Sequence, residues 1–345
     1  MFSRRIGAGE VCVLTYHGVL RDGLVKDKSP TADTLVSAGQ FRRQLRFLKS
    51  RYQLITPEAF HFWLTENGSL PQRAVLLTCD DGLLNVLTEM VPILLDEGAR
   101  CLFFVTSASL DDRPQYLWYQ ELYRMLDAAP GDALVVAEGK NVRKDALAAK
   151  GLIRYWGELV QKFSAFSFHD RKEALLSLRK EWQLAVDGRM CDRGSSEECR
   201  DRLLNRTELR QLVTQGMTVG AHTVSHPLLA EMSAELAAQE IRECKLSLES
   251  CLQLEIWALA YPFGDEGSAG AREMKMAEDA GYACAFLNCG GGVMRQSSPR
   301  YALPRAHVTW EMNLAEFEAH LSGFHEDLQR RFRGGAIQSG PGQAA

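Results

Sequence analysis

Short, wholly apolar runs alternate with amphipathic segments along much of this chain, and the alternation predicts its secondary structure. Three early runs, at residues 11–16, 74–78 and 101–105, have the character of buried strands. The segment 84–97, which Gly98 follows, has helical spacing and connects the second run to the third. A strand, a helix and a strand at this spacing form a βαβ unit. Since the strands lack polar alternation, we expect an α/β fold whose parallel sheet is covered on both faces or closed into a barrel.

Between residues 111 and 205 the pattern changes. This part of the chain is rich in Lys, Arg, Glu, Leu and Trp, and segments 118–126 and 172–184 have helical spacing. The alternation of strands and helices resumes at Thr207 and continues to a final helix that Asn313 caps. The changes divide the chain into a first βα part at 9–110, a helical insertion at 111–205, a second βα part with a C-terminal helix at 206–332, and a disordered tail at 333–345.

Composition limits the classes of protein that fit this pattern. The 345 residues are 46% hydrophobic and 24% charged, which is enough apolar material for a large core. Lys and Arg number 40 against 44 Asp and Glu, so the net charge of −4 gives no electrostatic reason to expect nucleic acid as a partner. Nine scattered Cys without a C-x-x-C pair argue against a disulfide framework or a zinc ribbon.

The sequence predicts neither a signal peptide nor a transmembrane segment. The first ten residues lack the apolar core of a signal peptide, and no run of about 18 apolar residues predicts a transmembrane segment. We therefore expect a cytoplasmic protein, with the inner face of the membrane as a further place of action. The sequence does not indicate the oligomeric state.

Two adjacent carboxylates, Asp80 and Asp81, follow the predicted strand at 74–78. Neighbouring like charges cost free energy unless a cation, a hydrogen-bond network or a shifted pKa compensates. On these residues alone the pair indicates either a metal site or an acid/base pair. The structural alternative is an Asp-Asp-Gly turn that caps the following helix.

A second group of ligand-type side chains lies far downstream. His222 and His226 are four residues apart directly after the predicted strand 217–221, a spacing that lets both imidazoles turn toward one point. Two histidines and a carboxylate are a common ligand set for a catalytic divalent cation that keeps an open position for water. Because active sites of α/β folds gather at the carboxyl ends of strands, we expect the histidines beside the acidic pair.

Three motifs, in this order, carry a family resemblance: Thr-Cys-Asp-Asp-Gly at 78–82, His-Thr-Val-Ser-His-Pro at 222–227 and Leu-Ala-Tyr-Pro-Phe-Gly at 259–264. Together they resemble the polysaccharide deacetylase family with the NodB homology domain, carbohydrate esterase family 4. The third motif is similar to the version found in its exopolysaccharide-associated branch. The resemblance covers residues 9–110 and 206–310. It implies a distorted (β/α) barrel of the NodB type with a helical insertion, and metal-dependent removal of N-acetyl or O-acetyl groups from sugars.

The resemblance also implies roles for the motif residues. Asp80 matches the family's general base. The residues that match its metal ligands, usually for zinc and otherwise for Co²⁺, Ni²⁺ or Mn²⁺, are Asp81, His222 and His226. Tyr261 and Phe263 match its substrate and oxyanion loop, where the backbone N–H of Phe263 is the expected donor. A cation beside Asp81 agrees with the physical argument, since it relieves the repulsion within the acidic pair.

The first and third motifs each depart from the family pattern. The usual Phe of the first motif is Cys79, and the Arg that many members carry in the third motif is Ala260, so the group that normally orients the base is missing. Arg305 is a candidate to orient Asp80 in its place, and a pair with a surface carboxylate is the alternative.

The proton donor is the least determined part of the site. The family's late Leu-x-His motif, which supplies the general acid, is not plainly present. His307 is the nearest candidate, His17 is its rival because it also follows a predicted strand, and a structural role is the alternative for each.

Aromatic residues of the predicted insertion include Trp118, Tyr119 and Trp182. Their faces could stack on sugar rings, but at helical spacing such residues are more often core, and we expect core here.

The sequence thus predicts a metal-dependent hydrolase that deacetylates an amino-sugar-containing polysaccharide, glycolipid or precursor. Two alternatives stay open. One is a deformylase or deacetylase of a lipid-linked sugar. The other, motivated by Ala260 and the undetermined general acid, is a catalytically silent carbohydrate-binding subunit.

Overall fold

The computed structural model describes residues 9–24, 29, 31–110, 115–137, 140–184, 200–265, 267–310 and 312–321. The predicted disordered tail at 333–345 lies outside the described residues, as does the end of the predicted C-terminal helix.

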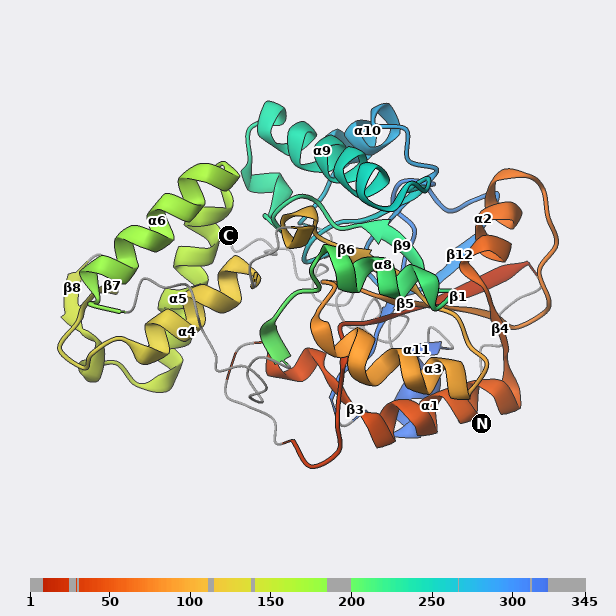
Figure 1. Cartoon of the computed structure of the whole chain (residues 1–345), viewed down its shortest axis with the longest axis horizontal. Coiled ribbons are helices and arrows are strands. Elements are labelled where there is room, and N and C mark those ends of the chain that lie inside the picture. Colours follow the sequence, from red (N-terminus) through yellow and green to blue (C-terminus); the bar gives the residue numbers. More distant parts are fainter. Residues whose placement is uncertain are drawn as a thin grey trace, which may run out of the picture.

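A parallel sheet lies at the centre of the molecule (Figure 1). Within the described residues its strands are β1 (Glu10–Tyr16), β4 (Gln53–Ile55), β5 (Ala74–Cys79), β6 (Leu102–Val105), β9 (Thr218–Ala221), β10 (Ala258–Ala260), β11 (Cys284–Phe286), β12 (Gly292–Met294) and β13 (Ala306–His307). Their order is β11-β10-β9-β6-β5-β1-β12, with β4 also paired to β5 and β13 to β1. Among these strands β12 alone runs antiparallel to its neighbour, so the predicted parallel sheet is confirmed.

The sheet curls because one short segment connects its two sides. Leu303 pairs in parallel with Phe286 at the end of β11, and its carbonyl accepts a bond of 2.9 Å from the N–H of Leu287. A few residues later β13 pairs with β1, with His307 opposite Thr15. The segment 303–308 therefore bridges β11 and β1 near their carboxyl ends and brings the two sides of the sheet together. The predicted distorted barrel is confirmed.

Successive side chains of the strands face two different buried layers, as the period of two requires. In β5, Val75, Leu77 and Cys79 join the core beneath the outer helices, whereas Ala74 and Leu76 belong to a second cluster. Both layers are apolar, which explains why the strands are continuous apolar runs in the sequence.

The second cluster fills the inside of the curl. Phe104 of β6 lies 5.5 Å, between ring centroids, from Phe286 of β11, although two strands separate β6 from β11 in the sheet. Gly220 of β9 makes room for this pair, because a Cβ at that position would stand 2.6 Å from the Phe104 ring. Contacts across the sheet at this distance require a concave inner face.

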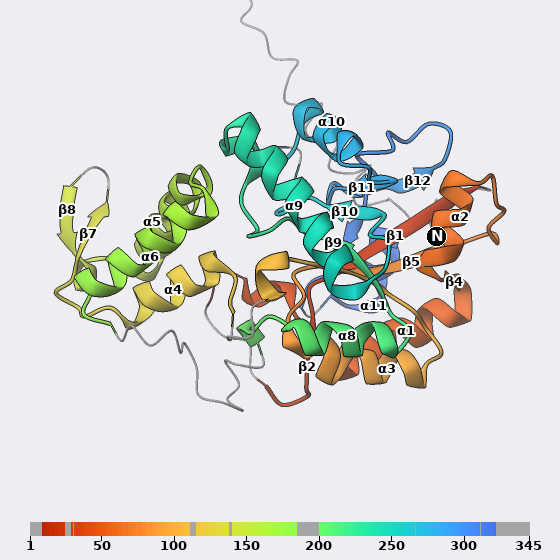
Figure 2. The ribbon, with the colours of Figure 1, turned by 45° about the horizontal axis from the view of Figure 1, so that its top comes forward.

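Helices cover the outer face of the sheet (Figures 1 and 2). They are α1 (Ala38–Arg51), α3 (Val91–Asp96), which continues a π-helical turn at Val86–Met90, α8 (Arg206–Thr214), α9 (Ala234–Leu252), α10 (Ala271–Asp279) and α11 (Leu314–Leu321). Helix α2 (Pro57–Thr65) instead packs Phe60, Trp63 and Leu64 against the inner cluster. Both α1 and α2 have a side-chain N-cap: Ser37 and Thr56 accept bonds from the backbone N–H of Gln40 and Ala59.

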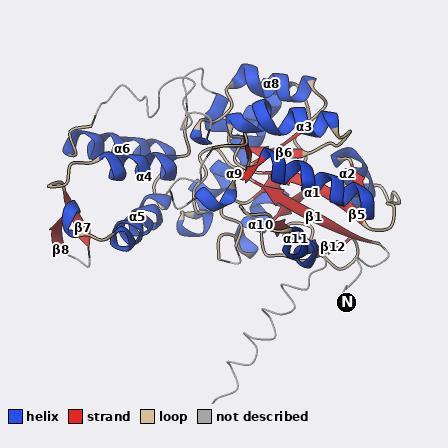
Figure 3. Ribbon diagram, turned by 90° about the horizontal axis from the view of Figure 1, so that it is seen from below, coloured by secondary structure: helices blue, strands red, loops and turns tan. Residues whose placement is uncertain are grey.

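A second group of elements lies to one side of the sheet (Figures 1 and 3). It consists of α4 (Trp118–Ala128), α5 (Ala149–Ser164) and α6 (Phe168–Glu181), which we call the side helices, and the antiparallel hairpin β7 (Leu134–Ala137) and β8 (Lys140–Arg143). The helices have a hydrophobic cluster of their own, in which Trp118, Tyr119 and Trp182 are buried. The hairpin was not expected from the sequence.

Among the described residues no helix combines the length and the apolar character that crossing a membrane would require.

Candidate active site and metal centre

The predicted site residues lie at or shortly after the carboxyl ends of parallel strands, except Arg305, which directly precedes β13. His17 follows β1, Asp80 and Asp81 follow β5, His222 and His226 follow β9, Tyr261 and Phe263 follow β10, and Arg305 and His307 lie at β13. The strand alternation also sets their direction. Since Cys79 and Ala221 face the outer core, Asp80 and His222 are directed to the inner side of the curl.

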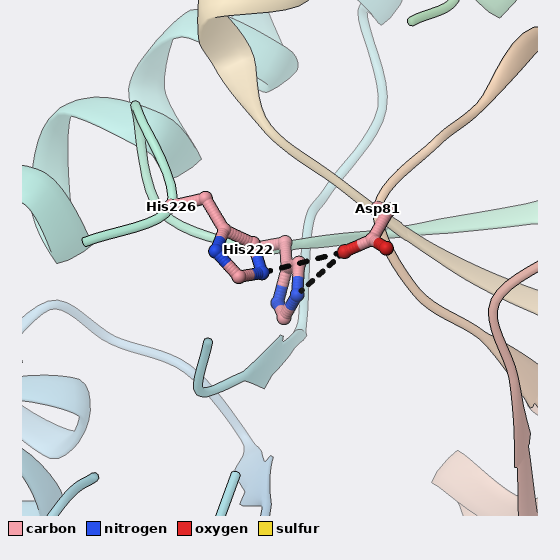
Figure 4. Close-up of side chains that lie close together, drawn as sticks. All are labelled: Asp81, His222 and His226. Atoms are coloured by element: carbon pink, nitrogen blue, oxygen red, sulfur yellow. Dashed lines mark ion pairs between the residues drawn. The ribbon is translucent and has the colours of Figure 1, made fainter. Parts of the chain in front are cut away.

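Three of these side chains form a compact cluster of possible metal ligands (Figure 4). Asp81, His222 and His226 are all buried, and one ligand atom of each lies within 4.8 Å of the others. Asp81 Oδ1 is 3.3 Å from Nε2 of His226 and 3.6 Å from Nε2 of His222. The structure therefore brings together the three residues predicted as metal ligands.

The loops that present these ligands adopt unusual backbone conformations. Asp81 has φ of 75°, Thr223 of 65° and His226 of 57°, all in the left-handed region that non-glycine residues seldom occupy. Such residues cost about 1–3 kcal/mol each and collect at functional sites. The Thr223 hydroxyl offsets part of this cost by accepting a bond of 3.1 Å from the N–H of His226. Gly82 follows with φ of 73°, and a Cβ there would lie 2.7 Å from a Val105 methyl group.

The hydrogen bonds of His222 determine its tautomer. Its Nδ1 lies 2.7 Å from the carbonyl oxygen of Ala260, which can only accept, so Nδ1 carries the proton. Nε2, the atom directed at Asp81, then has a lone pair available for a metal. This is the usual arrangement of a histidine ligand, in which the second nitrogen donates to a carbonyl.

The donor set fits a divalent cation. Oδ1 of Asp81 is buried and makes no hydrogen bond within the described residues. Burial alone would raise the pKa of Asp81, but the neighbouring His222 and His226 side chains lower it below its ordinary value, so the carboxylate is charged. A buried anion with two imidazole nitrogens and no other donor is the arrangement that a cation completes.

The neighbouring carboxylate has a different partner. Arg305 forms a bidentate ion pair with Asp80, with distances of 2.6 Å from Nη1 to Oδ1 and 2.7 Å from Nη2 to Oδ2. Both side chains are almost completely buried, at 0% and 1% exposure. Burial would raise the pKa of Asp80, but the Arg305 charge outweighs it and lowers the pKa. The contact expected for Arg305 in place of the missing arginine of the third motif is present.

Arg305 is itself fixed by the inner layer of the barrel. Its guanidinium carbon lies 5.2 Å from the ring centroid of Phe104 and 5.7 Å from that of Phe286. Nη1 also donates to the hydroxyl of Thr78, 3.2 Å away. Stacking and hydrogen bonding hold the planar guanidinium group of Arg305 in the orientation that a bidentate ion pair needs.

His17 and His307 form an edge-to-face pair, with ring centroids 4.7 Å apart. Nδ1 of His17 and Nε2 of His307 are buried atoms without a hydrogen-bond partner among the described residues. Burial and the neighbouring His17 lower the pKa of His307 to about 3, so this ring is neutral at pH 7. The structure thus brings together both predicted candidates for the proton donor rather than separating them.

The third motif places its two aromatic residues differently. Tyr261 is fully buried, its N–H pairs with Phe286 of β11, and its hydroxyl donates to the carbonyl of Tyr301, 3.0 Å away. Phe263 is 37% exposed, has φ of 63°, and lies with its ring centroid 5.0 Å from that of His226. Phe263 therefore lies beside the candidate metal centre, whereas the hydroxyl of Tyr261 has a partner in the core.

A family model described as polysaccharide deacetylase matches residues 186–285, which include the second and third motifs. The resemblance to the polysaccharide deacetylases is confirmed. No curated protein is similar enough in sequence to count as a relative.

Solved structures share the fold of these deacetylases with this chain at low sequence identity. The deacetylase PplD of Streptococcus pyogenes, solved in complex with acetate, is 17% identical, with a TM-score of 0.57, over 91% of this chain and 99% of the other. IcaB from Ammonifex degensii is 18% identical, with a TM-score of 0.56, over 91% and 98%. BC0361, a polysaccharide deacetylase from Bacillus cereus, is 16% identical, with a TM-score of 0.54, over 90% and 69%. The predicted NodB-type fold is confirmed, and the family model supports carbohydrate deacetylation.

Two contacts of this candidate site were not predicted from the sequence. Trp118 of α4 donates from Nε1 to the carbonyl oxygen of His226 at 2.9 Å. Arg171 of α6 donates from Nη1 to the hydroxyl of Ser225 at 2.7 Å. The expectation that Trp118 is buried is correct, but the residue also touches a candidate ligand loop. Nothing in the local sequence of either residue indicates this contact.

Cys79, which replaces the usual Phe of the first motif, has a packing role in the structure. The side chain is fully buried on the outer side of β5, and burial, together with the nearby acidic groups, raises the pKa of its thiol well above the ordinary value. A protonated thiol in this position fills space in the core and is not a nucleophile.

Proposed function

We propose that the protein is a metal-dependent hydrolase that removes N-acetyl or O-acetyl groups from an amino-sugar-containing polysaccharide, glycolipid or precursor. The observation that carries this proposal is that the two adjacent carboxylates have different partners. Asp81 faces two imidazoles and Asp80 faces a fixed guanidinium, at the same carboxyl edge of the sheet. A turn that merely capped a helix would need neither arrangement.

The residues that would hold the cation are Asp81, His222 and His226, with zinc as the first choice among divalent ions. Such a cation supplies Lewis-acid polarisation of an acyl carbonyl and of a water molecule. Three protein ligands leave a position open for this purpose, as catalytic sites require.

Asp80 is the proposed general base. Arg305 keeps it ionised and aligns both of its oxygens, so that it can accept a proton from an attacking water. Arg305 also keeps the carboxylate from turning toward the cation. Opposite, the backbone N–H of Phe263 is the proposed donor to the developing oxyanion.

The departing amine or alcohol needs a proton, and the proposed source is the pair of His17 and His307. The two imidazole rings lie with their centroids 4.7 Å apart. Since His307 is neutral in the resting protein, we expect it to take up and pass on a proton during the reaction. Separate His17→Ala and His307→Ala variants, assayed for the release of acid from an amide and from an ester substrate, distinguish the two rings.

The proposal is tested by measuring acetate released from chito-oligosaccharides by the zinc-loaded protein and its Asp80→Asn variant. We expect Asp80→Asn to lose about 10²–10⁴-fold in rate, the usual contribution of a general base. Asp96→Asn is the matched control, because Asp96 is an exposed carboxylate whose partner Arg42 is also at the surface. Equal rates for Asp80→Asn and the wild type would contradict the proposed mechanism.

The same experiment separates the alternatives. A lipid extract offered in place of chito-oligosaccharides tests a lipid-linked substrate, and formate instead of acetate among the products identifies a deformylase. A protein that binds the sugar and zinc but releases neither acid is a silent binding subunit.

A further inference from the structure

The side helices lie apart from the central sheet, yet they reach the loop that carries a proposed metal ligand (Figures 1 and 2). This loop, residues 222–226, joins β9 to the segment before α9 and contains His222 and His226. Two side chains of the side helices donate hydrogen bonds to it, one from α4 and one from α6.

The first contact is made by Trp118, the first residue of α4. Its indole N–H donates to the carbonyl oxygen of His226 at 2.9 Å, and the bond is buried. The next residue of α4, Tyr119, places its ring centroid 5.0 Å from that of His226. Helix α4 therefore contacts both the backbone and the side chain of His226.

The second contact is made by Arg171 of α6, which is only 1% exposed. Its Nη1 donates to the Ser225 hydroxyl at 2.7 Å, while Nε and Nη2 donate to the carbonyls of Phe163 and Phe166 at 2.9 and 2.8 Å. Its guanidinium carbon lies 4.9 Å from the ring centroid of Trp118. Arg171 thus connects the end of α5, the start of α4 and the ligand loop.

Ser225 is held from the opposite side by the barrel. Glu240 of α9 accepts a bond of 2.8 Å from the Ser225 N–H and one of 2.5 Å from its hydroxyl. The hydroxyl accepts from Arg171 and donates to Glu240, so both of its roles are used. A charged group on each side fixes Ser225, which is the residue immediately before His226.

We propose that Trp118 and Arg171 are positioning residues for the metal centre, which hold His226 in its ligating conformation from outside the barrel. The inference rests on the proposed metal site. The loop contains two left-handed non-glycine residues, Thr223 and His226, and this conformation persists only if surrounding contacts favour it. Partners that orient a ligand typically change metal affinity by about 10–100-fold when removed. The side helices are then part of the catalytic architecture.

The test compares zinc affinity, measured by competition with a chromophoric chelator, in Trp118→Phe and Arg171→Met against matched controls. Trp182→Phe and Arg179→Met are the controls. Trp182 is buried in the same cluster with its indole nitrogen unpaired among the described residues, and Arg179 pairs with Glu121 within the side helices. We expect about tenfold or greater loss of zinc affinity in the first two variants and less than about threefold in the controls. The absorption spectrum of the Co²⁺-loaded protein gives a second readout and should change only in the first two.

A double-mutant cycle separates positioning from general stability. If Arg171 acts through Ser225, then Arg171→Met has little further effect on zinc affinity in a Ser225→Ala background. If Arg171 merely supports the side helices, its loss of affinity is the same in both backgrounds. Should Arg171→Met fail to fold, Ser225→Ala alone must weaken zinc binding by about tenfold, because it removes the same contact and keeps the Arg171 bonds to Phe163 and Phe166.

The outcomes distinguish this inference from the function on which it rests. A wild-type protein without stoichiometric affinity for zinc, Co²⁺ or another divalent ion overturns the proposed metal site. A wild type that binds zinc, with Trp118→Phe and Arg171→Met binding it equally well, overturns the positioning role alone. Equal losses in the variants and in the Trp182 and Arg179 controls overturn it as well.

Discussion

The candidate site has two sides, and each contains a buried carboxylate. The two carboxylates differ in the source of the positive charge that compensates them. On the metal side, Asp81 faces His222 and His226, and the three side chains can hold a metal ion. On the base side, Asp80 is paired by Arg305 in a buried, bidentate geometry, so the protein itself supplies the cation. The left-handed backbone of Asp81 separates the two side chains. Adjacent like charges are therefore tolerated because each has a separate counter-charge, one internal and one expected from solution.

The two sides also differ in where their parts come from. The metal side is built from two short motifs whose ligand types are recognisable in the sequence. The base side depends on the segment 303–308, which bridges β11 and β1 and carries Arg305 to Asp80 from 225 positions away. The segment that closes the barrel is thus also the one that places Arg305 against Asp80.

The largest effect is expected on the metal side. Removing divalent ions with a chelator should lower acetate release by about 10³-fold or more, because Lewis-acid polarisation contributes several kcal/mol. Added zinc should restore the rate, with retained folding verified by circular dichroism. Full activity in a protein proven metal-free would mean that the base side works alone.

The next effect concerns the base side. Replacing Arg305 by Met leaves Asp80 as an unpaired buried charge, so we expect the free energy of unfolding to fall by about 3–5 kcal/mol. Urea denaturation measures it. Asp80→Asn introduced into Arg305→Met should recover part of the loss.

The matched control for Arg305→Met is Arg51→Met, which breaks an exposed pair with Glu318 and should cost less than about 1 kcal/mol. If Arg305→Met is as mild as this control, the ion pair does not hold the base side together.

The sequence predicted the parts of this site unevenly. Continuous apolar runs predicted where the strands end. Because Asp80, Asp81 and His222 directly follow such runs, the sequence also predicted that they lie together at one edge of the sheet. The two-residue strand β13 has no such pattern. The sequence alone therefore could not decide whether Arg305 orients Asp80 or pairs with a surface carboxylate, and the register of β13 with β1 was needed.

Contacts between distant elements were beyond prediction for the same reason. The bond from Arg171 to Ser225 joins residues 54 positions apart, and neither the helix period of α6 nor the loop motif encodes it. The hairpin of β7 and β8 lay in a stretch whose composition suggested only helices.

A third prediction concerns pH and the metal-free protein. The pKa of His307 is about 3 in the folded state against about 6.5 when unfolded, so the unfolded state binds the extra proton between these values. The titration of His307 therefore leaves the free energy of unfolding unchanged above about pH 6.5. As the pH falls from there toward 3, this group lowers the free energy of unfolding by at most about 1.4 kcal/mol per pH unit. Urea unfolding between pH 7 and pH 4 should give a smaller slope for His307→Asn than for the wild type. An identical slope would place the titration elsewhere.

The smallest effect is expected at Tyr261. Since its hydroxyl donates to the carbonyl of Tyr301, Tyr261→Phe should cost about 1 kcal/mol of stability and leave KM for chito-oligosaccharides unchanged. A clear rise in KM with unaltered stability would return Tyr261 to the substrate loop that the sequence motif implied.

The central claim is that neighbouring carboxylates have separate functions, Asp81 as a ligand and Asp80 as a base. Elemental analysis of purified Asp80→Asn and Asp81→Asn, each offered one equivalent of zinc and then dialysed, tests it most directly. The account predicts that Asp80→Asn retains one zinc per chain while losing acetate release, and that Asp81→Asn retains none. Loss of zinc from both variants alike, or from Asp80→Asn alone, would contradict the account.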